Sequence, residues 1–127
     1  MERKHVPVVF VVDDEIVISK SLATILQRSG YSARSFTDPL EALEHIKIDP
    51  PDLLISDVVM PYLSGIDLAI LVKEYCPDCR ILLFSGQALT TDLLGEASKQ
   101  GYDFTLLAKP VHPTELLRET ANIEVGR

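Results

Sequence analysis

Residues 8–15 read "VVFVVDDE", an apolar run that ends abruptly at two adjacent aspartates. The run from Val8 to Val12 consists only of β-branched and aromatic residues, which predicts a β-strand. The carboxylates of Asp13 and Asp14 repel one another unless a positive group lies between them. The strand is therefore expected to end at a site that holds a cation.

Strand-like and helix-like segments alternate along the rest of the chain. The expected strands are residues 7–12, 31–36, 52–57, 80–85 and 104–109, and helical spacing is found at about 15–29, from 38 onward, at 65–75, at about 90–100 and from 113 onward. Most of these strands are apolar throughout, which is typical of parallel strands that are buried on both faces. The alternation predicts a doubly wound α/β domain, a five-stranded parallel sheet with helices on both faces. The more polar segment 31–36 is expected at an edge.

Local signals predict several helix boundaries. Gly30 is expected to stop the first helix, and Asp38 to cap the second with Pro39 in its first position. One of the two acids that follow the first strand is expected to cap the first helix as well as serve a metal. Gly65 is expected to open the third helix.

Composition excludes several classes of protein. The chain has 127 residues, the size of one domain, and a net charge of −7. This charge argues against direct binding of nucleic acid, which requires basic surfaces. No apolar stretch is long enough to span a membrane, and the N-terminus lacks the features of a signal peptide. A cytoplasmic protein without membrane contact is expected.

The segment "CPDC" carries the two cysteines, Cys76 and Cys79. The alternatives are a redox pair, half of a metal site, or a connector with two incidental thiols. A redox pair belongs at the start of a helix, whereas this segment lies between a helix and the next strand. Zinc would need two further ligands, and the histidines are scattered. We interpret the segment as a connector.

Polar side chains follow four of the five expected strands. Asp13 and Asp14 follow the first strand, Asp57 ends the third, Ser85 ends the fourth and Lys109 ends the fifth. Because the carboxyl ends of parallel strands meet at one edge of a sheet, these groups are expected to converge. Three carboxylates favour Mg²⁺, and the hydroxyl and the ammonium suit an anion beside it. The pattern is typical of a phosphoryl-transfer centre.

These motifs resemble the receiver domain of bacterial two-component response regulators. The resemblance covers nearly the whole chain and is carried by "VVDDE" (11–15), "DVVMPYLSG" (57–65), "LLFSG" (82–86) and "AKP" (108–110). It implies a flavodoxin-like fold with strand order 2-1-3-4-5. It also implies a single receiver domain over residues 1–127, with a core from about 6 to 123 and no output domain in this chain.

The resemblance also implies roles for individual residues. Asp57 is the expected phosphoacceptor, which takes a phosphoryl group from a histidine kinase or a phosphotransfer protein. Mg²⁺, or Mn²⁺, is expected to be held by Asp13, Asp14, Asp57 and the backbone carbonyl of Val59. Ser85 and Lys109 are expected to contact the phosphoryl group. The Lys109–Pro110 peptide bond is expected to be cis.

The function implied is that of a signalling module rather than an enzyme that turns over a substrate. Phosphorylation is expected to change the conformation and thereby regulate a downstream protein effector, and a weak homodimer is left open. Leu106 stands where many family members have a mobile aromatic residue, and Phe104 is the nearest aromatic on that strand. We therefore expect the response to run through the helix at 90–100. Met60 and Tyr62 are expected to pack within their loop.

Two other functions are compatible with parts of the pattern. A receiver-like interaction module that is never phosphorylated would need one of the chemical positions to be lost, and none is. A metal-dependent phosphatase with an aspartate nucleophile would carry Asp-x-Asp after its first strand, whereas Asp13 and Asp14 are adjacent. Labelling by a phosphodonor or steady turnover of a phosphate ester distinguishes these alternatives.

Overall fold

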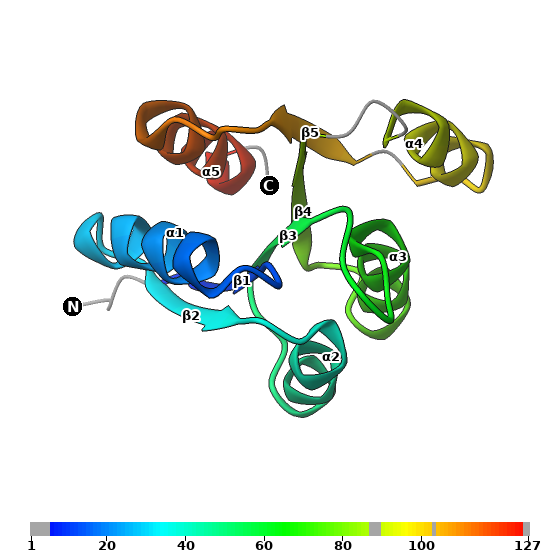
Figure 1. Ribbon diagram of the computed structural model, residues 1–127. Helices are drawn as coiled ribbons and strands as arrows, with labels where there is room; N and C mark the ends of the chain where they lie inside the picture. The colour runs from blue at the N-terminus through cyan, green and yellow to red at the C-terminus, as the bar shows by residue number, and fades with distance from the viewer. Residues whose placement is uncertain (1–5, 87–89, 103, 126–127) are drawn as a thin grey trace.

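A computed structural model describes residues 6–86, 90–102 and 104–125, in which five strands alternate with five helices (Figure 1). The strands are β1 (Val8–Val12), β2 (Ser32–Phe36), β3 (Leu53–Asp57), β4 (Arg80–Ser85) and β5 (Thr105–Ala108). The helices are α1 (Ile16–Arg28), α2 (Pro39–Ile48), α3 (Gly65–Tyr75), α4 (Thr90–Lys99) and α5 (Pro113–Val125). The elements expected from the sequence are confirmed, with small differences at their ends.

The five strands form one parallel sheet in the order β2-β1-β3-β4-β5. The order implied by the resemblance is therefore confirmed, and β2 lies at an edge as predicted. The chain first adds β2 on one side of β1 and then crosses to add β3 on the other side. Loops after β1 and β3 consequently diverge at this point, which is where open α/β sheets bind ligands.

Helices cover both faces of the sheet: α1 and α5 lie on one face, and α2, α3 and α4 lie on the other (Figure 1). The strands β1, β3 and β4 therefore bury side chains in two cores. All five residues of β3 are buried, including Asp57 at its end. The apolar, non-alternating sequence of these strands is explained by this double burial.

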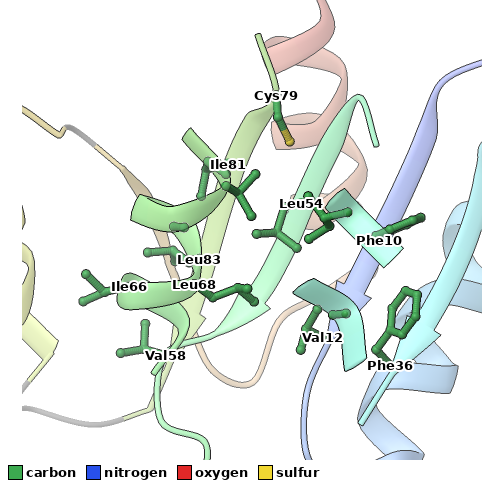
Figure 2. Packing of buried hydrophobic residues seen from close by; sticks show 14 of the residues in the cluster. Phe10, Val12, Phe36, Leu54, Val58, Ile66, Leu68, Cys79, Ile81 and Leu83 are labelled. Carbon is green, nitrogen blue, oxygen red and sulfur yellow. The ribbon is translucent and has the colours of Figure 1, made fainter. Parts of the chain in front are cut away.

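The core beneath α2 and α3 shows how the central strands are held (Figure 2). Leu54 of β3 and Leu83 of β4 are completely buried, and Phe10 and Phe36 of the neighbouring strands pack with ring centroids 4.9 Å apart. Burial of each such side chain contributes about 1.5–3 kcal/mol. This packing fixes the strands whose ends carry the polar groups.

Most of the predicted helix boundaries are confirmed. Gly30 follows α1 with a φ of 95°, and the Asp38 carboxylate accepts the backbone N–H of Leu40 at 2.9 Å to cap α2. The prediction that Asp13 or Asp14 caps α1 is wrong. The N-cap residue is Glu15, which makes no side-chain capping bond. The Asp13 carboxylate accepts, at 2.9 Å, the N–H of Glu15, which lies before the first turn of the helix.

Candidate functional site

The side chains at three strand ends are joined by one lysine. Lys109 directly follows β5, and its Nζ donates to Oδ2 of Asp57 at 3.0 Å and to Oδ2 of Asp13 at 3.3 Å. These two carboxylates lie at the ends of β3 and β1, so the ammonium connects strands that are far apart in sequence. The Nζ also lies 5.1 Å from the ring centre of Phe84, which adds a favourable cation–π contact.

Three carboxylates gather at this edge of the sheet. Asp13, Asp14 and Asp57 each offer an oxygen, and these oxygens all lie within 4.8 Å of one another. Asp13 is fully buried and Asp57 is 5% exposed, whereas Asp14 is exposed. The cluster is therefore embedded in the protein on the side of β1 and β3 and reached from solvent on the side of Asp14.

The electrostatics of the cluster reflect burial and unbalanced charge. Burial raises the pKa of Asp13, the N–H of Glu15 opposes this, and the negative charge of Asp57 raises it further. For Lys109, burial lowers the pKa, but the hydrogen bond and charge of Asp57, followed by those of Asp13, raise it overall. Lys109 therefore remains an ammonium at neutral pH and partly offsets the carboxylates.

The cluster fits a hard divalent cation. One ammonium faces three carboxylates, so an excess of negative charge remains at a partly buried place. All the donors are oxygens, which Mg²⁺ prefers over sulfur and nitrogen. The predicted ligands Asp13, Asp14 and Asp57 are thus brought together, whereas the contribution of the Val59 carbonyl stays a prediction.

The backbone around Asp57 is fixed from several sides. Asp57 pairs with Phe84 in the sheet, and the N–H of Val58 donates to the carbonyl of Phe84 at 3.1 Å. The hydroxyl of Ser56 donates to the carbonyl of Asp57 at 2.9 Å. A Cβ atom at Gly65 would overlap that same carbonyl oxygen. The loop after β3 therefore returns to Asp57, and only glycine fits at the point of return.

This close approach of Gly65 was not predicted, because it is a contact across a loop. A capping residue beside it was also missed: the hydroxyl of Ser64 accepts the N–H of Asp67 at 3.1 Å at the start of α3. The Ser-x-x-Asp spacing just before an apolar run is a known signal for such a helix start. Ser64 thus anchors the end of the loop that surrounds Asp57.

Ser85 and Lys109 lie beside one another at the ends of β4 and β5. The backbone N–H of Lys109 donates to the carbonyl of Ser85 at 3.1 Å, and Ser85 is 7% exposed. The Lys109–Pro110 peptide bond is cis, as predicted. The structure therefore places Ser85 in the same group of strand ends as the carboxylates.

Two residues of the loop between β3 and α3 were expected to pack within it, and they differ in burial. Met60 is partly buried and packs against the core beneath α3, which confirms its prediction. Tyr62 is 88% exposed and has a φ of 71°, so the prediction that it packs is wrong. The reason is the left-handed backbone at this position, which sequence patterns do not reveal for a tyrosine.

The "CPDC" segment forms a turn at the opposite end of the sheet from the carboxylates. The N–H of Cys79 donates to the carbonyl of Cys76 at 3.0 Å, and the ammonium of Lys73 holds the carbonyl of Cys79 at 2.6 Å. Burial, followed by the nearby Cys76, raises the pKa of the Cys79 thiol to about 12. A thiol with this pKa is a poor redox group, which supports the interpretation as a connector.

The two thiols are expected to differ strongly towards alkylation. At pH 8 a thiol with a pKa near 12 is about one ten-thousandth thiolate, so native Cys79 should resist iodoacetamide, whereas the half-buried Cys76 should react. Peptide mass spectrometry after a short exposure measures this difference. Both thiols should react in urea, and rapid labelling of Cys79 in the native protein would contradict its burial.

The region of the expected conformational switch is described only in part. Leu106 on β5 is 36% exposed, while Phe104 packs against the core and stacks on Tyr102 with ring centroids 5.8 Å apart. The nearest aromatic residue, Phe104, therefore lies directly before β5 and is partly buried. Residues 87–89, which lead from Ser85 into α4, lie outside the described residues, so the response through α4 stays a prediction.

Comparison with known proteins identifies the class that this fold and site define. The model of the family described as "Response regulator receiver domain" matches residues 9–121. The match includes every strand end described above. The chain belongs to the response regulator receiver domain family.

Individual relatives support the same assignment. The response regulator receiver protein CpdR of Brucella abortus is 31% identical over 111 residues, which cover 87% of this chain and 91% of that protein. The phosphoglycerate transport system transcriptional regulatory protein PgtA of Salmonella typhimurium is 36% identical over 109 residues, which cover 86% of this chain and 26% of that protein. The chain thus spans about a quarter of PgtA.

Solved structures agree with the fold. A response regulator receiver domain protein from Clostridium thermocellum has a TM-score of 0.82 and 27% identity, covering 93% of this chain and 94% of that chain. The chemotaxis protein CheY4 of Vibrio cholerae also has a TM-score of 0.82, with 26% identity, covering 94% of this chain and 99% of that chain. Both similarities extend over nearly the whole chain.

Membership of the family defines the general role. Receiver domains are signalling modules of two-component systems rather than conventional enzymes, and response regulators work with histidine kinases and downstream effectors. In the part of the chain that the structure describes, no helix is long and apolar enough to cross a membrane.

Proposed function

We propose that this chain is a phosphoacceptor that takes a phosphoryl group from a phosphohistidine onto Asp57 and thereby regulates a protein effector. One observation carries the proposal. The Asp57 carboxylate ends the central strand, bonded to Lys109 at 3.0 Å and gathered with Asp13 and Asp14 in one cluster. A carboxylate that is flanked by an ammonium and a cation-binding cluster has the surroundings that phosphoryl transfer requires.

The chemistry assigns a task to each side chain. A carboxylate oxygen of Asp57 forms a bond to phosphorus while the bond from phosphorus to the donor's imidazole nitrogen breaks, which leaves an acyl phosphate. The Lys109 ammonium already lies within hydrogen-bonding distance of Asp57 and would balance charge on the phosphoryl oxygens. Ser85 ends the neighbouring strand, and we assign its hydroxyl to hold a phosphoryl oxygen.

A divalent cation fits the remaining donors. We propose that Mg²⁺, or Mn²⁺, is held by Asp13, Asp14, Asp57 and the carbonyl of Val59. Such an ion, when bound, offsets negative charge on the phosphoryl group and on the carboxylates. The chain's own contribution is to hold two buried carboxylates at fixed strand ends, so that the site needs little rearrangement.

The partners follow from this chemistry. The donor is proposed to be a histidine kinase or a phosphotransfer protein, because response regulators work with histidine kinases, whose phosphohistidine holds a phosphoryl group that a carboxylate can accept. The effector is proposed to be a protein, since a net charge of −7 disfavours contact of this domain with nucleic acid.

Intact-mass measurement after incubation with acetyl phosphate and Mg²⁺ tests the proposal. One phosphoryl group should be added per chain, and hydroxylamine should remove it, since an acyl phosphate is labile to this nucleophile. Chelation of the metal by EDTA should suppress the labelling. A chain that stays unmodified would favour the interaction module, and steady release of phosphate from a simple phosphate ester would favour a phosphatase.

Loss of either acid beside Asp57 is expected to weaken Mg²⁺ binding. At metal sites in general, removal of a group that only hydrogen-bonds to a metal ligand lowers the metal affinity by about 10–100-fold. Asp13→Asn and Asp14→Asn remove proposed ligands themselves, so each should lower the affinity for Mg²⁺ by about tenfold or more. Asp13→Asn should also stabilise the metal-free protein, because it removes the buried charge whose pKa is raised. Titration calorimetry and thermal unfolding with and without Mg²⁺ measure both effects.

A matched control is Asp49→Asn, which removes an exposed acid at the C-terminal end of α2. This variant should bind Mg²⁺ like the parent. The metal would have to lie elsewhere if Asp13→Asn and Asp14→Asn also bound it with the parental affinity.

A further inference from the structure

Tyr62 occupies a backbone conformation that is costly for a tyrosine. Its φ is 71°, and the N–H of Leu63 donates to the carbonyl of Pro61 at 2.8 Å, which closes a three-residue turn around it. A γ-turn with positive φ at its centre is rare and strained. Among the described residues, Tyr62 is alone in having a positive φ without being glycine.

The turn holds the tyrosine out of the protein. The flanking Met60 and Leu63 both pack against the core beneath α3, so the backbone is fixed on each side of the turn. Between them the Tyr62 side chain is 88% exposed, the largest exposure among the exposed large apolar side chains described. A side chain so exposed adds little to the stability of the domain, although its backbone conformation reduces that stability.

The turn lies in the loop that follows Asp57. Its loop begins directly after Asp57 and returns to it, since Gly65 packs against the Asp57 carbonyl. Val59 in the same loop is 50% exposed. Two exposed side chains, Val59 and Tyr62, thus lie in a loop that starts at Asp57 and returns to it.

We propose that Tyr62 is a recognition residue that anchors the protein that donates the phosphoryl group. This inference rests on the proposed phosphorylation of Asp57. The Asp57 side chain is only 8% exposed, so a histidine that reaches it brings the donor's surface against the surrounding loops. A small phosphodonor reaches the same carboxylate without covering the turn.

The strained turn gives such an anchor a physical advantage. Tyrosine supplies a large contact area with few rotatable bonds, and tyrosines are enriched among the residues that dominate binding energy. Because Met60 and Leu63 already hold the backbone of the turn, the loop needs little further ordering on binding. The strained turn thus lowers the stability of the free domain, and the exposed tyrosine that it presents raises the affinity for the donor.

Phosphotransfer kinetics with two kinds of donor test this inference. The protein donor is the histidine kinase that labels the parent fastest among a panel of kinases autophosphorylated with ATP, and the small donor is acetyl phosphate with Mg²⁺. Tyr62→Gly and Tyr62→Ala should each lower kcat/KM from the kinase by about tenfold or more, while labelling by acetyl phosphate stays within about twofold. Tyr62→Phe should keep most of the transfer, since the anchor is apolar.

Thermal unfolding separates recognition from a structural effect. Glycine relieves the left-handed backbone and alanine does not, so Tyr62→Gly should melt about 4 °C above Tyr62→Ala, although both transfer poorly. Tyr75→Ala removes the half-exposed tyrosine at the far end of α3 and should transfer like the parent. Normal transfer from the kinase to Tyr62→Gly would overturn the inference, whereas failure of acetyl phosphate to label the parent would overturn the proposed function instead.

Discussion

Asp57→Asn should take up no phosphoryl group from acetyl phosphate or from a histidine kinase. Asparagine matches aspartate in shape, but its amide does not form a stable bond to phosphorus. The fold should persist, because the side chain ends β3 at a sheet position fixed by its pairing with Phe84. The effect is therefore a complete loss of labelling in a folded protein, measured by intact mass and by peptide mapping.

The consequences for Lys109 provide a second measurement. In Asp57→Asn the ammonium loses its carboxylate partner at 3.0 Å and keeps the one on Asp13 at 3.3 Å. The hydrogen bond and charge of Asp57 are the main groups that raise the pKa of Lys109, so this pKa should fall in the variant. The ion pair between Lys109 and Asp57 contributes its full stability at pH values below the usual pKa of lysine. This contribution is lost as the pH rises through the raised pKa of Lys109. Asp57→Asn lacks the pair, so it should lose less stability than the parent over that alkaline range.

Asp49→Asn serves again as the control that should be labelled like the parent. Equal labelling of Asp57→Asn and the parent, or a phosphoryl group found on Ser85, would assign the chemistry to another residue. In that case the position of Asp57 in the cluster would reflect metal binding alone.

The central strands show why most of this site could be predicted from the sequence. Apolar segments such as "VVFVV" and "DLLISD" are long enough and uniform enough to indicate strands that are buried on both faces. Once the strands are parallel, their common direction brings Asp13, Asp57 and Lys109 to one edge. Their convergence thus follows from a property of the backbone, and the structure confirms it with contacts of 3.0 and 3.3 Å.

Features that depend on contacts across a loop could not be predicted from the sequence pattern. The overlap between a side chain at position 65 and the carbonyl of Asp57 exists only after the loop has closed. The left-handed conformation of Tyr62 occurs in a turn between Met60 and Leu63, which both pack against the core. Residue type predicts the opposite for a tyrosine, since positive φ is rare without glycine or asparagine.

Gly65→Ala is expected to be the most destabilising small substitution in the loop that surrounds Asp57. The added methyl group would meet the carbonyl oxygen and carbon of Asp57 and the hydroxyl of Ser56, and two of these atoms belong to backbone. The backbone of Asp57 cannot move away easily, because it is paired in the sheet. The backbone of Gly65 is also held, because its N–H donates to the carbonyl of Val58 at 2.8 Å. A loss of about 3 kcal/mol or more in the free energy of unfolding is expected, as for overpacked buried sites.

Gly95→Ala is the matched substitution, since a Cβ atom at this position in α4 meets nothing within 4 Å. Alanine is favoured over glycine inside a helix by about 1 kcal/mol, so this variant should be slightly more stable than the parent. Urea unfolding of the two variants therefore tests whether contact with Asp57, rather than any change from glycine to alanine, causes the loss. Because the methyl group in Gly65→Ala would push on Asp57, the proposed phosphoacceptor, the folded fraction of this variant should also be labelled more slowly by acetyl phosphate. Parental stability and labelling in Gly65→Ala would show that the loop after β3 can move away from Asp57, and the close return of that loop would then not be needed to position the carboxylate.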